Sequence, residues 1–430
     1  MATITAMLRC VHVPATIAVL VALGALSAHA QGDAAQTPAQ APPPPPPHPH
    51  LELGDARGSW NWPLQMHLTE AAEKKLQQIN ERAYNRYVNQ RDRGERMTVL
   101  VWTPPEARRI RAMLVIPELA HSMSFGAHRS LREVATRHEM GVIYLRTVTH
   151  VDLLPLILDD IAQPTGIAEY RHAPWVIWGM SAAGRVPAIF TWTHPERTVA
   201  SISWHAEVPP WTADDRYPPE WARPAQTHLH VNVNGQTEWG QTWYRHVRPG
   251  LLNYRRHKDW LPHQMVAYGV DHGDHRPPGN KSDEGIERVT RQRAFNYVAL
   301  FVDKALTLRL PEEDYPTDGP LPLRKVDESS GWLIHPRAIE QLLGEPWRPL
   351  QFDQEAGIYR MDPTGRSGSQ VERQPLTEPL LRPAADLDAG QRKQWFWVAD
   401  RELAEAWFDL HAVRGQAFPG KPEAAHTPGE

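Results

Sequence analysis

The sequence predicts an α/β fold, in which helices cover both faces of a mostly parallel central sheet, followed by a small C-terminal extension. Three observations lead to this prediction. The chain has 430 residues, which is enough for one large domain with a sizeable core. It is 41% hydrophobic and 22% charged, as is typical of a globular protein. Between residues 97 and 306, short apolar runs alternate with helical stretches, and this alternation indicates parallel strands joined by crossover helices.

The first 30 residues have the pattern of a secretory signal peptide. Arg9 forms a short basic region, and residues 13–26 are mostly apolar. Ala28-His29-Ala30 then has the small-x-small pattern of a cleavage site. The apolar stretch is shorter than the roughly 20 residues that span a bilayer, and no later segment approaches that length. We therefore expect an exported protein, periplasmic or extracellular, without membrane insertion.

Cleavage at this point would remove Cys10, the single cysteine of the chain. A mature chain without cysteine excludes disulfides, a thiolate nucleophile and cysteine-bound zinc. It would carry 45 basic residues after the loss of Arg9 and 50 acidic ones, for a net charge of −5. A nucleic-acid partner is not expected, because phosphates require a strongly basic surface.

Residues 31–50 are predicted to form a proline-rich, disordered linker. They contain eight prolines, six of them consecutive from Pro42 to Pro47, and such a run favours an extended polyproline II conformation. His48 and His50 lie in this stretch, and we interpret them as solvated linker residues rather than a metal site. Folded sequence is expected to begin near Leu51.

The folded part starts with a helix capped by Thr69 and continues with the α/β alternation. Apolar residues of this first helix recur every three or four positions: Ala72, Leu76, Ile79, Ala83 and Tyr87. The predicted strands are residues 97–102, 112–116, 141–145, 175–178, 199–204, 229–233 and 264–268. The predicted helices are residues 152–161, 182–193, 244–257 and 286–306. Residues 311–430 form the C-terminal extension, with a short helix at 401–411 and a disordered end.

A serine at a predicted strand-to-helix turn is the most informative feature of the sequence. Ser181 follows an apolar strand and precedes a helical pattern, and small residues at Gly179 and Ala183 would let the backbone make a tight turn. Such a turn exposes one hydroxyl group. Ser181 also begins a helix, where the N–H of Ala182 would stabilise a developing oxyanion.

This turn resembles the nucleophile elbow of the α/β-hydrolase superfamily, whose usual pattern is Gly-x-Ser-x-Gly. The chain has Ala183 in place of the second glycine, and Gly184 follows one residue later. The resemblance covers residues 97–306 and implies the α/β-hydrolase fold. It also implies a Ser-His-acid triad whose nucleophile, acid and histidine follow in that order along the chain, each just past a strand end.

Two carboxylates downstream of Ser181 are candidates for the triad acid. Glu238 lies in the turn after the predicted strand 229–233, which is the usual place in the superfamily. Glu207 lies one strand earlier, where some members carry their acid. We favour Glu238 and keep Glu207 as the alternative.

The candidate base follows the strand 264–268. His272 is preferred because Gly273 follows it directly, as in the histidine loop of the superfamily, and His275 is the alternative. The two histidines do not predict a metal site, because the run contains glycine and leads into the prolines of residues 277–279, so it is a loop rather than a zinc-binding helix. We expect no metal and no cofactor.

A second oxyanion donor is expected in the loop after the strand 112–116. The backbone N–H of Leu119 is the candidate, and Glu118 and His121 would then lie at the rim of the site. The alternative interpretation of Glu118 is a plain loop charge.

Tryptophan is frequent, with 17 residues, and several lie between the candidate nucleophile and base. The proline-rich residues 207–226 suggest a cap inserted over the sheet edge. Trp204, Trp211 and Trp239 are candidates for the substrate pocket, where indole rings would stack on sugar or aromatic groups. The alternative is that these rings fill the core.

The resemblance implies an exported serine esterase that cleaves carboxylic esters through an acyl-enzyme, similar to feruloyl esterases and polyhydroxyalkanoate depolymerases. Its partner would be a small-molecule or polymeric ester, and the sequence does not define an oligomeric state. Two alternatives remain: a serine peptidase of the same fold, and a non-catalytic polysaccharide or cell-wall binding protein with a degenerate triad.

Overall fold

The computed structural model describes most of the region between residues 60 and 419. The described residues are 60–117, 120–146, 153–206, 227–238, 243–256, 260–272, 288–312, 314–343, 350–353, 358–361, 378–412 and 416–419. All belong to one structural unit, residues 44–430. The predicted signal peptide, linker and cap lie outside the described residues.

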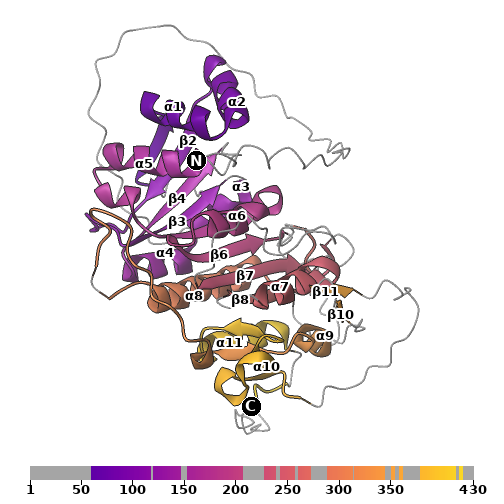
Figure 1. The fold of residues 1–430 in the computed structure, drawn as a ribbon. Coiled ribbons are helices and arrows are strands. Elements are labelled where there is room, and N and C mark those ends of the chain that lie inside the picture. The colour runs from indigo at the N-terminus through magenta and orange to yellow at the C-terminus, as the bar shows by residue number, and fades with distance from the viewer. Residues whose placement is uncertain are drawn as a thin grey trace, which may run out of the picture. The chain divides into compact units, whose positions relative to one another are not determined.

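A central sheet of eight strands organises the described residues, in the order β1-β2-β4-β3-β5-β6-β7-β8 (Figure 1). The strands are β1 (Trp62–Met66), β2 (Met97–Trp102), β3 (Ala112–Pro117), β4 (Met140–Arg146), β5 (Trp175–Met180), β6 (Thr198–Trp204), β7 (His228–Gly235) and β8 (Trp260–Ala267). Strand β2 is antiparallel to β1 and β4, and all other neighbours are parallel. This order and these directions are those of the α/β-hydrolase fold, which confirms the predicted fold class.

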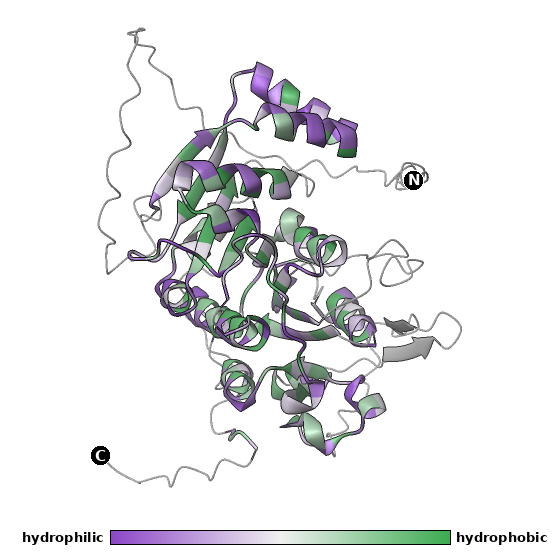
Figure 2. Ribbon diagram, turned by 60° about the vertical axis from the view of Figure 1, so that its left-hand side comes forward, coloured by the Kyte–Doolittle hydropathy of each residue, from purple (hydrophilic) through white to green (hydrophobic). Residues whose placement is uncertain are grey.

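Helices cover both faces of this sheet. They are α1 (Glu70–Ile79), α2 (Glu81–Asp92), α3 (Ala120–Gly126), α4 (Arg129–Arg137), α5 (Leu153–Thr165), α6 (Val186–Thr193), α7 (Arg248–Arg255) and α8 (Arg291–Arg309). Neighbouring residues of a strand point to opposite faces, so Leu114 packs in one core cluster with α4 and α8, whereas Val115 packs in another with α1 and α5. Figure 2 shows the mainly hydrophobic strands of this sheet.

The first predicted helix is two helices, α1 and α2, separated at Asn80. The side chain of Asn80 accepts a hydrogen bond from the N–H of Ala83 at 3.0 Å and caps α2. Ile79 belongs to the apolar spacing of the predicted helix, but it is the last residue of α1 and is 50% exposed. Strand β1 and the helices α3 and α4 were not predicted from the sequence.

Other element boundaries differ by a few residues from the predicted ones. The helix after Ser181 begins as a 3-10 helix, Ser181–Arg185, before α6. The predicted helix 244–257 is a π-helical turn, Trp243–Val247, followed by α7. Strand β8 starts at Trp260, four residues earlier than predicted. Among the described residues, no helix is both long enough and apolar enough to span a membrane.

The C-terminal extension packs on the open edge of β8. Its elements are β9 (Trp332–Ile334), α9 (Ala338–Leu343), β10 (Leu350–Asp353), β11 (Ile358–Met361), β12 (Leu381–Pro383), α10 (Ala389–Arg392), β13 (Phe396–Val398) and α11 (Arg401–His411). The indole N–H of Trp407 donates to the carbonyl of Gln264 at 2.7 Å, and His411 accepts from the N–H of Val266 at 3.0 Å. Helix α11 therefore satisfies backbone groups of an edge strand that would otherwise remain open.

Candidate active site

Strand β5 ends in a sharp turn that places Ser181 at the carboxyl edge of the sheet. Ser181 has φ of 50°, in the left-handed region that residues with a side chain seldom adopt. A Cβ atom on Gly179 would lie 2.3 Å from the carbonyl oxygen of Ala183 and 2.6 Å from Cδ of Pro187, so this turn requires glycine. A strained serine between a buried strand and a helix has the geometry of a nucleophile elbow.

Gly184 explains how the chain accommodates Ala183 in place of glycine. A Cβ atom on Gly184 would lie 1.9 Å from Cβ of Ala206, which follows the neighbouring strand β6. The hydroxyl of Ser203 on β6 donates to the carbonyl of Gly184 at 3.2 Å. The contact between the turn and β6 is therefore made by Gly184, one residue beyond the usual motif, and alanine is accepted at 183.

The structure brings Ser181, His272 and Glu238 together. The Oγ of Ser181 lies 2.9 Å from Nε2 of His272, and Nδ1 of the same ring lies 2.5 Å from Oε1 of Glu238. An ionised carboxylate only accepts hydrogen bonds, so Nδ1 carries the proton. Nε2 then has a free electron pair and accepts the hydrogen bond from the serine hydroxyl. This tautomer is the one that a general base requires.

Glu238 and His272 are held by turns that are tied to one another. The turn after β7 and the loop after β8 share four hydrogen bonds. The N–H and hydroxyl of Thr237 donate to the carbonyl of Val270, at 3.2 and 3.1 Å. The N–H of Gln236 donates to the carbonyl of Ala267, and the N–H of Gly269 donates to Oε1 of Gln236, both at 3.0 Å. Because these strands are neighbours in a parallel sheet, their carboxyl ends deliver the acid and the base to the same place.

Glu238 is ionised although its side chain is fully buried. Burial by itself raises the pKa of this carboxyl group, but hydrogen bonds from His205, His272 and the N–H of Gly235 outweigh it and lower the pKa to about 2. The carboxylate therefore keeps its negative charge at any pH near neutral. A buried charge of this kind stabilises a cation that forms on the neighbouring imidazole.

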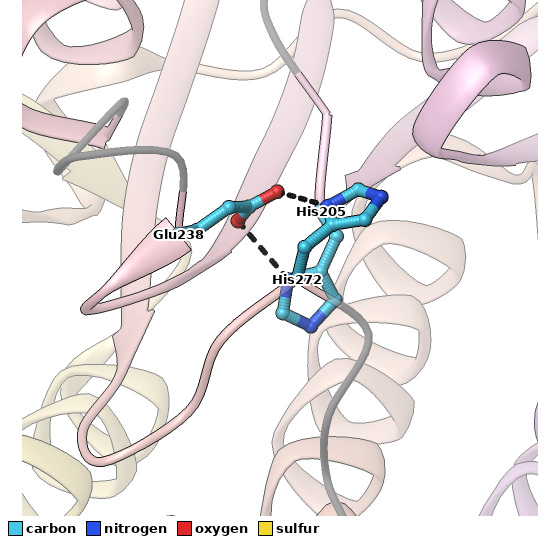
Figure 3. A group of neighbouring side chains, drawn as sticks. All are labelled: His205, Glu238 and His272. Carbon is cyan, nitrogen blue, oxygen red and sulfur yellow. Dashed lines mark hydrogen bonds and ion pairs between the residues drawn. The ribbon is translucent and has the colours of Figure 1, made fainter. Parts of the chain in front are cut away.

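His205 was not identified from the sequence, yet it contacts the same carboxylate. Its Nδ1 lies 3.1 Å from Oε2 of Glu238, while His272 contacts the other oxygen, as Figure 3 shows. His205 is fully buried, with φ of 46°. It directly follows the predicted strand 199–204. The available signal was its position, because it is the first residue past β6, at the edge where the other candidates lie.

The arrangement of His205, Glu238 and His272 fits a hydrogen-bond network better than a metal centre. Their possible ligand atoms lie within 4.8 Å of one another, which alone would suit a small ion. However, Nδ1 of His272 lies only 2.5 Å from Oε1 of Glu238. These two atoms are too close together to be neighbouring ligands of a tetrahedral zinc ion, which lies about 2 Å from each ligand atom. Both carboxylate oxygens are already acceptors for these rings, so we assign no metal here.

The remaining predicted site residues are only partly covered. Ala182 directly follows Ser181 in the 3-10 helix Ser181–Arg185, and its role as an oxyanion donor stays a prediction. The side chain of His121 is not described. Six further predicted residues lie outside the described residues: Glu118, Leu119, Glu207, Trp211, Trp239 and His275.

The assignment of Trp204 to the substrate pocket is wrong. Its side chain lies in the core, and the residue is 3% exposed. The ring centroid lies 5.0 Å from that of Trp178 and 5.2 Å from that of Phe295 on α8. Strand β6 is a central strand whose face is covered by α8, so a large ring at this position fills the core instead of lining a pocket.

Several solved structures that resemble this chain are hydrolases. An esterase from Pyrobaculum calidifontis is 11% identical, with a TM-score of 0.33, over 55% of this chain and 98% of the other. A cold-adapted esterase from an Arctic intertidal metagenomic library is 13% identical, with a TM-score of 0.32, over 50% and 89%. Poly(aspartic acid) hydrolase-1 from Sphingomonas sp. KT-1 is 12% identical, with a TM-score of 0.30, over 41% and 89%.

No protein-family model matches the sequence, and no curated protein matches it. Because the identities and TM-scores to solved structures are low, the fold assignment rests on the strand order, and the site rests on its own geometry.

Proposed function

We propose that this protein is a serine hydrolase that cleaves carboxylic esters through an acyl-enzyme on Ser181. The observation that carries the proposal is the unbroken hydrogen-bond chain from Ser181 through His272 to Glu238. The φ of 50° at Ser181 supports it independently, because backbone strain of this kind is concentrated at functional sites.

In the first half of the reaction, Nε2 of His272 takes the hydroxyl proton as Oγ of Ser181 bonds to the ester carbonyl carbon. The carbonyl π electrons move to the oxygen, and the N–H groups of Ala182 and Leu119 donate to the resulting oxyanion. The tetrahedral intermediate collapses and expels the alcohol oxygen, which takes the proton back from His272. One oxyanion donor is worth about 3 kcal/mol of transition-state stabilisation.

In the second half, water attacks the acyl-enzyme. His272 takes a proton from the water, and the hydroxide oxygen bonds to the acyl carbon. Collapse of the second tetrahedral intermediate releases the carboxylic acid and returns the proton to Oγ of Ser181. Throughout, Glu238 holds the Nδ1–H tautomer of His272 and stabilises the imidazolium that forms in each half.

His205 acts in this scheme as a positioning residue. It does not reach Ser181 in the hydrogen-bond chain, but it fixes the second oxygen of Glu238 and helps to keep that carboxylate ionised. A carboxylate anchored on both oxygens presents Oε1 to His272 in one orientation, so the imidazole is held toward Ser181.

We further propose that the protein is exported by its signal peptide and acts on small or polymeric esters in the periplasm or outside the cell. Hydroxycinnamoyl esters and polyesters are the substrates to test first, since the sequence resembles feruloyl esterases and polyhydroxyalkanoate depolymerases. A panel of p-nitrophenyl, hydroxycinnamoyl and polyester substrates would rank these classes.

The test of the nucleophile is the Ser181→Ala variant. We expect it to lose hydrolysis of a p-nitrophenyl ester by about 10⁴-fold or more while it keeps its fold, and a fluorophosphonate probe should label the wild type but not the variant. Unlabelled wild-type protein would indicate a binding protein with a degenerate triad, and cleavage of peptides in preference to esters would indicate a peptidase. Either result would overturn the esterase proposal.

A further inference from the structure

A second candidate site lies between α7 and the C-terminal extension. It is a cavity of about 450 Å³, within the range of small-molecule sites. Its walls come from α7, from the segment between β9 and α9, from β12 and from the α10 region. None of Ser181, Glu238 and His272 lines it, so the proposed reaction does not account for it.

The cavity is lined by three arginines, Arg248, Arg337 and Arg382. Arg248 is buried and forms an ion pair with the buried Glu340, so one of these charges is compensated. Among the described lining residues, the only carboxylate is that of the exposed Glu378, so guanidinium groups outnumber carboxylates there.

Arg382 has capacity left for a ligand. Its Nε is buried, and this atom has no hydrogen-bond partner among the described residues. A buried donor without a partner is costly, because it has lost its hydrogen bonds to water. The guanidinium group lies 5.5 Å from the ring centroid of Trp395, so an aromatic surface adjoins this donor.

His335 adds a neutral donor. Its Nδ1 accepts the backbone N–H of Arg337 at 3.1 Å, which leaves the proton on Nε2. Burial, reinforced by the charges of the same three arginines, lowers the pKa of His335 to about 4, so the ring is neutral at pH 7. Gln391 and Gln394 complete the polar lining with amide groups that both donate and accept.

We propose that this cavity binds a small molecule that carries a carboxylate or phosphate group on a hydroxylated ring. Guanidinium groups bind both oxyanions through paired hydrogen bonds, which lysine does not provide. The side chains of Trp395 and of the two glutamines then contact the ring and its hydroxyl groups. An acidic sugar or a sugar phosphate has this chemistry, whereas a neutral sugar lacks the group that the arginines bind.

Isothermal titration of the full chain in a phosphate-free buffer of low ionic strength tests the proposal. The probes are glucuronic acid, glucose 6-phosphate and glucose. We expect saturable binding of at least one of the two anions, and the one that binds more tightly identifies the oxyanion. Glucose should bind at least about tenfold more weakly, because the charge-assisted hydrogen bonds are missing. Equal binding of glucose, or no binding of either anion, would overturn the proposal.

Two variants assign the binding to this cavity. Arg382→Gln and Arg337→Gln should each weaken the anion by about tenfold or more. Arg93→Gln is the matched control, since it removes the same charge at an exposed position outside the cavity and should bind as the wild type does. Thermal melts establish that each variant folds. Unchanged binding in both cavity variants, or an equal loss in the control, would place the anion elsewhere and refute the site.

Discussion

Glu238 shows how one residue combines burial with a permanent charge. Two imidazoles and one backbone N–H surround its carboxylate, and the pKa falls to about 2 although burial acts in the opposite direction. The low pKa of Glu238 therefore depends on each of these hydrogen-bond donors. Loss of one of them leaves a buried charge that is less well compensated, and the pKa of the carboxyl group rises.

Replacement of Glu238 tests its proposed role as the triad acid. In Glu238→Gln the amide presents an N–H group to His272, which favours the wrong tautomer, and kcat for a p-nitrophenyl ester should fall by about 10⁴-fold. Glu207→Gln is the control and should keep kcat near the wild-type value. A larger loss in the control than in Glu238→Gln would make Glu207 the acid.

Replacement of His205 tests its proposed positioning role through turnover. His205→Ala removes a hydrogen bond that holds Oε2 of Glu238, so kcat for a p-nitrophenyl ester should fall by about tenfold. His205→Asn, whose amide can donate to the same oxygen, should return kcat toward the wild-type value. Equal kcat in the wild type and in His205→Ala would contradict this role.

At the scale of elements, the turn between β5 and its 3-10 helix depends on two glycines for different reasons. Gly179 allows the turn to fold back on itself, whereas Gly184 lets the 3-10 helix approach the end of β6. The second contact is between elements, and it joins the serine turn to the strand that leads to His205. Displacement of either element would therefore move both Ser181 and the support of Glu238.

The contact between Gly184 and Ala206 can be measured with a mutant cycle. Gly184→Ala should lower the free energy of unfolding by about 1–3 kcal/mol, because the new methyl group would lie 1.9 Å from Cβ of Ala206. Ala206→Gly in the same chain removes that overlap and should restore most of the loss. Urea denaturation of the four proteins gives the coupling energy. Additive effects of the two changes would show that the contact is absent.

At the scale of the whole molecule, the C-terminal extension completes the sheet. Trp407 and His411 on α11 pair with backbone groups of β8, and Arg255 on α7 donates to the carbonyl of Trp395 at 2.9 Å. The core cluster that contains β8 and α8 also includes Trp407 and its neighbours from the extension. Stability of the sheet edge therefore depends on residues more than 140 positions further along the chain.

His411 makes this contact sensitive to pH. Its Nδ1–H donates to the carbonyl of Trp407 at 2.7 Å and its Nε2 accepts from Val266, so both bonds require a neutral ring. Burial lowers its pKa to about 4, below the roughly 6.5 of an unfolded chain. Between these values only the unfolded state binds the proton, so the free energy of unfolding decreases as the pH falls.

Urea denaturation between pH 7 and pH 4 checks this dependence. His411→Gln keeps a donor and an acceptor but does not titrate, so its free energy of unfolding should change less steeply, by up to about 1.4 kcal/mol per pH unit. Parallel curves for the wild type and the variant would show that His411 does not titrate in this range. His230 and His263, whose pKa values burial lowers to about 3, contribute to both curves equally.

The sequence predicted the sheet and the candidate residues where the signal is local. An apolar strand followed by Gly179 and Ser181 is a pattern of neighbours, and the positions of Glu238 and His272 follow from strand ends and from the resemblance. The role of His205 was not predicted, because it depends on a contact with Glu238, 33 positions further along the chain. Ile79 follows the apolar spacing of the sequence, but it is the last residue of α1 and is exposed.

The sequence by itself determined the alternation of strands and helices between residues 97 and 306, the tight serine turn and the absence of cysteine chemistry beyond Cys10, because these depend on composition and short-range pattern. Tertiary structure decided that Glu238 serves two histidines, that Trp204 belongs to the core, and that arginines from α7 and from the extension line one cavity. These features join residues far apart in the chain, and their energies come from burial and from charges that meet only after the sheet has formed.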